Sequence, residues 1–343
     1  MFKNLMVYRI GQDWRATVAQ IEESLEKAIF VECGATQAQS LGWAPPRGLA
    51  GAPLVEDIGG HWLMKLMIEQ RVLPGSVVKR RVDEIAAQIE QQTGRKPGKK
   101  QIKDLKEQAA QDLLPMAFTK QSAIKVWFAP AQHLLMIDAG SAARAEEVVT
   151  LLIKALDGLA LHLIQTAETP ASCMAAWLMD GVPPEGFTID RECELKSADE
   201  MKSVVRYARH SLDIEEVRQH LSGGKAPTRL AMTWRDRVSF MLTDTLQIKK
   251  ISFLELAFEG RGSPDKDGEF DADVALATGE LCKLIPELIE GLGGEHDFLA
   301  AGAALAALPQ TAAAAPTAQP TQTTPSGTQD AAASASSEPA PWE

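Results

Sequence analysis

Residues 77–114 read VVKRRVDEIAAQIEQQTGRKPGKKQIKDLKEQAAQDLL, and their pattern sets the organisation of the chain around them. Apolar residues recur here at intervals of three and four in two sets: Val78, Val82, Ile85 and Ile89, then Ile102, Leu105, Ala109 and Leu113. That spacing places each set on one face of an α-helix. Between the sets, Gly94, Pro97 and Gly98 are typical of a turn. The sequence therefore predicts a helical hairpin with four bases at its tip: Arg95, Lys96, Lys99 and Lys100.

Short strands and amphipathic helices are predicted on both sides of this hairpin. Alternating or continuous apolar runs predict strands at residues 3–9, 61–69, 122–128 and 133–139. Apolar residues at helical spacing predict helices at residues 16–30 and 142–156. The stretch GWAPPRG at residues 42–48 is expected to interrupt regular structure. This order predicts an α+β fold of antiparallel sheets and helices, with the hairpin inserted between two strands.

The second half of the chain is less regular before residue 228. Residues 228–234, 237–242 and 246–258 then alternate apolar and polar, which predicts an antiparallel meander. Residues 273–292 predict a helix that Gly293 and Gly294 end. Beyond residue 299 the chain is rich in Ala, Pro, Thr and Ser, so we expect a disordered tail. We divide the chain into an N-terminal part (1–73), the basic hairpin (74–118), a return to the central region (119–165), a C-terminal region (166–298) and the tail (299–343).

Charge is distributed unevenly along the chain. The 343 residues carry a net charge of −11, which by itself argues against nucleic-acid binding. Residues 71–125, however, contain twelve bases and six acids, so this window has a charge of +6 and the remainder −17. Because salt screens charges beyond about 8 to 10 Å, a local basic region can hold phosphates while an acidic surface elsewhere repels them. The pattern indicates a localised site for a polyanion.

Other chemistry is weakly supported by the sequence. No apolar run approaches the roughly 18 to 20 residues of a membrane span, and no signal peptide is evident. Four distant cysteines and six unpaired histidines give no metal or disulfide pattern, so we expect no metal, no cofactor and a cytoplasmic location. The alternating acids Asp265, Asp267, Glu269, Asp271 and Asp273 fit a solvated loop better than a calcium site. No nucleophile or phosphate-loop motif is complete, so we do not expect an enzyme.

Two basic sets are candidates for the polyanion site. The first follows the hairpin tip, with Lys103 and Lys106 continuing the side that Lys99 begins. The second consists of Lys202, Arg206, Arg209, Arg218, Lys225 and Arg229. Aromatic residues are only 6% of the chain, too few for a base-stacking platform, so contact with a duplex backbone is the better match. Three alternatives stay open: a solvated charged face, a scaffold whose hairpin docks an acidic partner, and a nuclease or other phosphoryl-transfer enzyme.

Several separated motifs, in order, resemble one bacterial family. These are FKNLMVYR (residues 2–9), GWAPP (42–46), LLPMAF (113–118), TGEL (278–281) and LIEGLGGE (288–295). Over residues 1 to about 296 the chain resembles the RdgC family of recombination-associated proteins. The resemblance implies horseshoe-shaped subunits that close into a ring-shaped homodimer around double-stranded DNA. It also implies binding with little sequence preference, association with the nucleoid, no enzymatic activity and negative modulation of RecA-dependent recombination.

The resemblance also suggests roles for particular residues. Phe118, after LLPMA, matches a phenylalanine that stabilises a gate between the two hairpins of the dimer. The alternative for Phe118 is an ordinary core aromatic. Arg209 and His210 match a Lys-Gln pair that contributes to DNA binding, with histidine in place of glutamine. From charge alone we add further candidate DNA contacts: Arg206 and the hairpin bases Arg95, Lys96, Lys99, Lys100 and Lys103.

Overall fold

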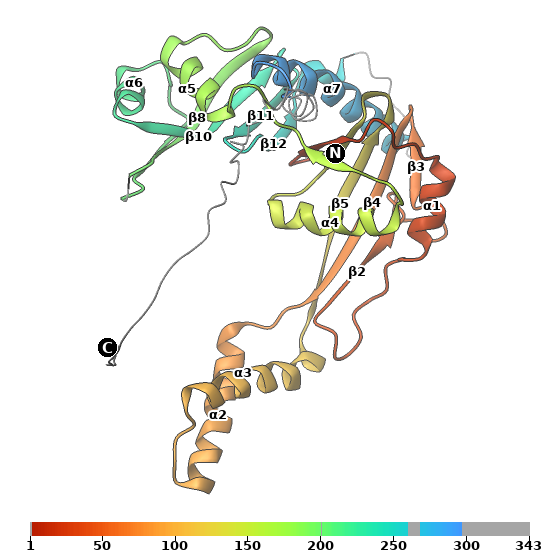
Figure 1. Ribbon diagram of the computed structural model, residues 1–343, viewed down its shortest axis with the longest axis vertical. Coiled ribbons are helices and arrows are strands. Elements are labelled where there is room, and N and C mark those ends of the chain that lie inside the picture. Colours follow the sequence, from red (N-terminus) through yellow and green to blue (C-terminus); the bar gives the residue numbers. More distant parts are fainter. Residues whose placement is uncertain (1, 200, 260–267, 297–343) are drawn as a thin grey trace, which may run out of the picture. The chain divides into compact units, whose positions relative to one another are not determined.

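The computed structural model describes residues 2–199, 201–259 and 268–296 (Figure 1). In these residues the chain forms two antiparallel sheets and seven α-helices, which confirms the α+β prediction. None of the described helices is long and apolar enough to cross a membrane. The predicted tail, as well as Asp265 and Asp267 of the acidic stretch, lies outside the described residues.

The first sheet has seven strands. Their order is β2-β4-β5-β6-β1-β7, and β3 pairs with β4 beside β2. The strands are β1 (Met6–Ile10), β2 (Gln39–Ala44), β3 (Val55–Ile58), β4 (His61–Arg71), β5 (Thr119–Ala129), β6 (Leu134–Ile137) and β7 (Leu161–Leu163). The strands predicted from apolar alternation correspond to β1, β4, β5 and β6. The long strands β4 and β5 pair without interruption from Trp62 and Phe128 to Arg71 and Thr119.

Both faces of this sheet are buried where β5 ends, although the first residues of β5, next to the hairpin, are exposed. Val126 and Phe128 point to a core that α1 (Val18–Glu26) and α4 (Ala142–Ala155) cover, whereas Trp127 points to the opposite core. All three side chains are fully buried. Since successive side chains of a strand point to opposite faces, a nearly continuous apolar run is what a doubly covered strand requires.

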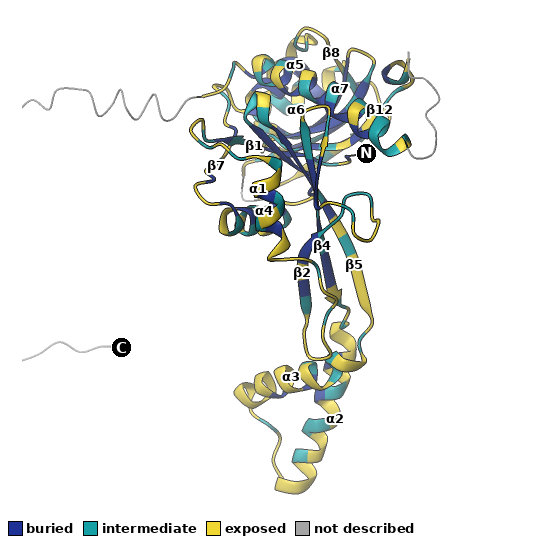
Figure 2. Ribbon diagram, turned by 90° about the vertical axis from the view of Figure 1, so that its right-hand side faces the viewer, coloured by how far each residue is buried: buried dark blue, intermediate teal, exposed yellow. Residues whose placement is uncertain are grey.

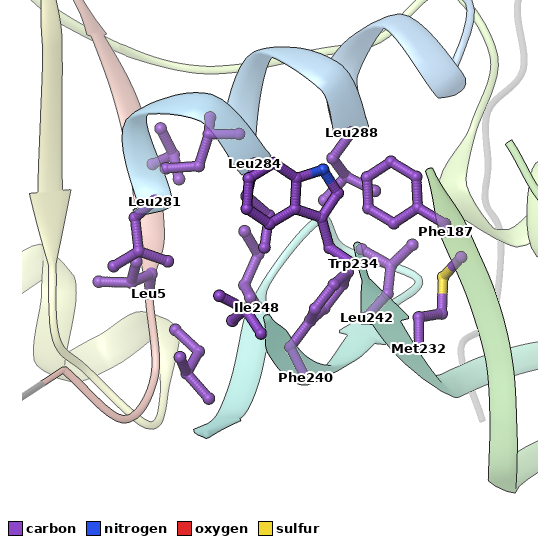
Figure 3. Close-up of a cluster of buried hydrophobic side chains, with 14 of the residues drawn as sticks. Leu5, Phe187, Met232, Trp234, Phe240, Leu242, Ile248, Leu281, Leu284 and Leu288 are labelled. Carbon is purple, nitrogen blue, oxygen red and sulfur yellow. The ribbon is translucent and has the colours of Figure 1, made fainter. Parts of the chain in front are cut away.

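The second sheet has five strands in the order β12-β11-β10-β8-β9. They are β8 (Phe187–Ser197), β9 (Val204–Ala208), β10 (Lys225–Trp234), β11 (Val238–Thr243) and β12 (Ile248–Phe253), so the meander is confirmed. Helices α5 (Pro170–Asp180), α6 (Glu215–Ser222) and α7 (Glu269–Gly291) pack in the same core as this sheet. Figure 3 shows Leu281, Leu284 and Leu288 of α7 among Trp234, Phe240 and Leu242 of the sheet.

Polar contacts fix α7 on this sheet. They also give structural roles to residues of two sequence motifs, TGEL and LIEGLGGE. Glu280 of TGEL accepts hydrogen bonds from Arg237 at 2.7 and 2.8 Å, and it is almost fully buried. Glu287 accepts the indole N–H of Trp234 at 2.7 Å. After α7 the backbone N–H groups of Gly293 and Gly294 donate to Glu290 and Ile289 with positive φ, which confirms the predicted glycine stop.

The α2–α3 hairpin is inserted between β4 and β5, as the sequence predicts. Its helices are α2 (Gly75–Thr93) and α3 (Lys99–Leu113), and Gly94 ends α2 in the left-handed conformation at φ 72°. The buried residues between the helices are Val78, Val82, Leu105 and Ala109. Figure 2 shows that most other positions of the hairpin are exposed. The hairpin therefore has a very small core of its own.

Two expectations were wrong in the N- and C-terminal parts. GWAPPRG does not begin an interruption, because Gly42, Trp43 and Ala44 lie in β2. A Cβ on Gly42 would sit 2.3 Å from the Cα of Phe30, so glycine lets residues 28–30 run against the strand. The acidic stretch is not wholly a loop either, since Glu269 to Asp273 form the first turns of α7, and Asp271 pairs with Arg47.

Candidate nucleic-acid interface

The cations of the hairpin are held on its outer surface. Arg95 and Lys96 lie in the turn after Gly94, and Lys99, Lys100 and Lys103 lie in the first turns of α3; all five are exposed. Lys99, Lys103 and Lys106 are spaced by four and three residues, so they share one side of α3. The small residues of the turn and the apolar stripe of α3 thus present the bases to solvent.

Acids neutralise only part of this surface. Arg80 and Arg81 lie 3.6 and 3.3 Å from Glu84, and Lys96 lies 4.0 Å from Glu90. Within the described residues no carboxylate pairs with the other exposed bases of the hairpin, which are Lys79, Arg95, Lys99, Lys100, Lys103 and Lys106. The hairpin therefore keeps a positive surface that phosphates could neutralise.

The start of α3 adds to this surface. Gly98 caps the helix without any side-chain hydrogen bond, and the first turn carries lysines and no acid. The free backbone N–H groups at a helix start and the helix dipole both favour an anion. The bases and the helix start therefore favour the same kind of partner.

Among the C-terminal candidates, Arg206 has the least charge available for a phosphate. It lies on β9 with its Nε 2.6 Å from a carboxylate oxygen of Glu194, which Arg229 also approaches at 3.8 Å. Burial opposes ionisation of Glu194, but hydrogen bonds from Thr228 and Arg206 prevail and hold its pKa below its ordinary value. A guanidinium already paired with an ionised acid has less net charge to offer a phosphate.

Arg209 and His210 lie in the turn that follows β9. Arg209 is exposed, adopts the left-handed conformation at φ 56° and lines a surface cavity of about 270 Å³ with Glu192 and Lys250. Glu192 and Lys250 pair at 2.6 Å. The ring Nδ1 of His210 lies 2.8 Å from the carbonyl oxygen of Ser211, so this nitrogen already has a local partner. Of the two, Arg209 is the better placed to meet an anion.

Phe118 is not a core residue of the single chain. Its side chain is 87% exposed, and Met116 two residues earlier is 74% exposed. Its backbone is nevertheless fixed, since its carbonyl accepts a hydrogen bond from Val72 at 2.7 Å. An exposed aromatic side chain on a fixed backbone is suited to contact with a partner. Met116 is a neighbour that the sequence analysis missed, although the apolar run LLPMAF beside so polar a hairpin was a usable signal.

The structure does not bring all the candidate residues together. Arg95 to Lys103 form one group on the hairpin, and Arg206, Arg209 and His210 form another on β9 and the turn after it. Among the described residues no ion pair joins the two groups. The described residues also contain no cluster of His, Cys, Asp or Glu suited to a metal. All four cysteines are free, and burial raises the pKa of Cys193 and Cys282 to about 11. Such thiols are poor nucleophiles.

The fold and this surface define a class: an α+β protein of two antiparallel sheets that carries a basic helical hairpin between two strands. A family model described as "Putative exonuclease, RdgC" matches residues 1–295. The chain therefore belongs to the RdgC family, as the motifs indicated.

Close relatives agree with this assignment. The chain is 45% identical over 299 residues to the recombination-associated protein RdgC of Dechloromonas aromatica (strain RCB), a match that covers 86% of this chain and 98% of that one. It is 44% identical over 297 residues to the protein of the same name from Cupriavidus pinatubonensis. That match covers 86% of this chain and 99% of the relative. The family model's description mentions an exonuclease, whereas these relatives are named for recombination.

Proposed function

We propose that this protein binds double-stranded DNA without sequence preference, as a ring-shaped homodimer of horseshoe-shaped subunits that encircles the duplex. Bound in this way at the nucleoid, it restrains RecA-dependent recombination by occupying the DNA. It does so without catalysis. The observation that carries the proposal is the set of exposed hairpin bases without carboxylate partners. The relatives named as recombination-associated proteins support a role in the same process.

The charge distribution is compatible with this function despite the net charge of −11. Contacts with phosphates are strong only over short distances at physiological salt, so the acids elsewhere need only face away from the DNA. A closed ring adds topological trapping to many weak contacts. The chain can therefore stay on DNA with few strong interactions.

Phe118 supplies a contact for closing the ring. Together with Met116 it offers an apolar surface beside the hairpin, and burying such a surface against a second copy is favourable. We therefore propose that the Phe118 side chains of two copies meet at the gate. The contact joins copies of the protein and leaves the bases of the hairpin free for DNA.

The test is a gel-shift titration with random-sequence duplex, linear and circular, at several salt concentrations. If the ring neutralises about six to eight phosphates, the logarithm of the affinity falls with the logarithm of salt with a slope of about −5 to −7. A slope near zero contradicts the proposed binding mode. Absence of any shift at low salt favours the scaffold with an acidic partner.

The same titration with magnesium separates binding from hydrolysis. The description of the family model includes the word exonuclease, so shortened products on linear duplex are the outcome that favours a nuclease. Intact DNA at saturating protein is the outcome we expect. Imaging of the protein on circular duplex then distinguishes a ring from an open clamp.

A further inference from the structure

Arg71 has an unusual set of partners at the base of the hairpin. Its Nε and one terminal nitrogen donate to the carbonyl of Gly34 at 3.3 and 3.1 Å, and the same terminal nitrogen donates to Cys33 at 3.4 Å. The other terminal nitrogen donates to the carbonyls of Leu114 and Ala117 at 3.1 and 3.0 Å. A guanidinium has five N–H groups, so these bonds use all of them.

This geometry removes Arg71 from the bases available to DNA. The residue is half-buried and all five of its N–H groups donate to backbone carbonyls, so a phosphate could bind it only by displacing those carbonyls. Its charge counts in the +6 of the basic window. Its hydrogen bonds instead act as a clamp: they tie the loop at residues 33–34 to the turn at residues 114–117.

The clamped turn leads directly into Phe118. Arg71 pairs with Thr119 across the two long strands, and the next residue, Val72, donates its N–H to Phe118. The backbone on the N-terminal side of Phe118 is therefore held by Arg71, and its own carbonyl is held by Val72. The turn has backbone hydrogen bonds of its own, from the N–H of Leu114 to Ala110 and from the N–H of Ala117 to Leu114, but the described residues of η1 (Leu114–Met116) include none that is buried.

We infer that Arg71 is a positioning residue: it sets the direction in which the hairpin and Phe118 are presented to a second copy. The inference rests on the proposed function for its consequence, but the local geometry can be tested without DNA. Lysine cannot replace arginine here. A single ammonium has three donors at one point, whereas the planar guanidinium reaches carbonyls on two sides.

The experiment compares Arg71→Lys and Arg71→Gln with wild type and with Arg80→Gln. Arg80 is an exposed arginine of the hairpin whose Nε lies 3.6 Å from a carboxylate oxygen of Glu84. Amide hydrogen exchange of Leu114 and Ala117, whose N–H groups donate to Ala110 and Leu114, is measured without DNA and reports the order of the turn. We expect exchange at least tenfold faster in both Arg71 variants and unchanged in Arg80→Gln. Retention on circular duplex should fall in both Arg71 variants, since a misdirected gate closes poorly.

Each outcome decides the inference. Unchanged exchange in both Arg71 variants overturns it, and so does Arg71→Lys behaving as wild type, because that result assigns Arg71 a role of charge alone. If Arg71→Gln does not fold, the milder Arg71→Lys carries the same comparison. If exchange is faster in the variants but the wild type does not bind DNA, the role of Arg71 in holding the turn stands. That result refutes the proposed function and not the inference.

Discussion

The hairpin and the two sheets differ in how much apolar side chain they bury. The sheets share large apolar cores, in which residues such as Trp127, Trp234 and Leu284 are fully buried. The α2–α3 hairpin buries four side chains, and most of its other positions are exposed. Hydrophobic burial therefore supplies most of the stability of the sheets, whereas the hairpin depends on its attachment to β4 and β5.

This difference separates stability from binding. A residue in the cores affects whether the protein folds, and a residue on the hairpin affects what the folded protein contacts. The two sets of residues should therefore respond to different measurements. The following variants test how completely the two regions are separated.

The largest effect is expected from Leu284→Ala in the core beneath α7. Leu284 is fully buried, so its truncation leaves a cavity and should lower the free energy of unfolding by about 3 kcal/mol. Urea unfolding followed by tryptophan fluorescence measures it. As a matched control, Leu105→Ala in the hairpin should leave the main transition in place and accelerate exchange only in α2 and α3. A single shared loss of stability in both variants would show that hairpin and sheets unfold together.

Phe118→Ser should change assembly and leave folding intact. Truncating an aromatic residue at the centre of a contact typically costs about 2 kcal/mol, or about 30-fold in affinity. The unfolding free energy should change by less than about 0.5 kcal/mol, because the side chain is exposed in the single chain. Sedimentation and retention on circular duplex measure the two effects. Val182→Ser, at another exposed apolar residue, serves as the control, and equal losses in both variants would argue against a specific gate.

Lys99→Gln combined with Lys103→Gln should weaken DNA binding without affecting stability. Each lost phosphate contact lowers the magnitude of the salt slope by about 0.9. Both copies in the ring carry the double variant, so the loss of up to four contacts should lower that magnitude by about 3.6. Gel shifts over a range of salt measure the slope. Arg206→Gln is the comparison, because Glu194 already pairs with Arg206. A larger change from Arg206 would place the main contact at the second sheet and not on the hairpin.

The smallest effect concerns pH at the base of the hairpin. The N–H of Cys33 donates to Glu69 at 2.5 Å, and this bond is the main cause that holds the pKa of Glu69 below its ordinary value. A carboxyl group with a lowered pKa stabilises the fold above its ordinary pKa, and the contribution is lost as pH falls through the lowered value. The difference in urea midpoint between wild type and Glu69→Gln should therefore shrink from about pH 6 to about pH 3. A constant difference would assign Glu69 no role that depends on ionisation.

The sequence predicted the elements whose side chains keep a regular period. The hairpin, β4, β5 and the meander were predictable because each has one apolar period and clear ends. By contrast, β8 was missed because bulges shift its register against β10, which breaks the alternation. Helix α5 was missed because apolar residues occupy most of its surface, so no single face is distinguished.

The candidate site was predictable in its charges and not in its geometry. The bases at the hairpin tip could be read from their spacing, and the structure places them on the exposed surface. The pairing of Arg206 with Glu194 joins two strands, and the bonds of Arg71 join three separate segments. Nothing in the local sequence distinguishes those two arginines from free bases, since their partners are brought to them only by the fold.

One detail of the long strands makes the basic hairpin a removable module. Because Arg71 and Thr119 are cross-strand partners, the chain leaves the sheet and re-enters it at neighbouring points. A short β-turn could close that gap. Lineages could therefore lengthen, shorten or recharge the insertion while the rest of the gene product went on folding, and protein engineers could exchange it for another ligand-binding arm.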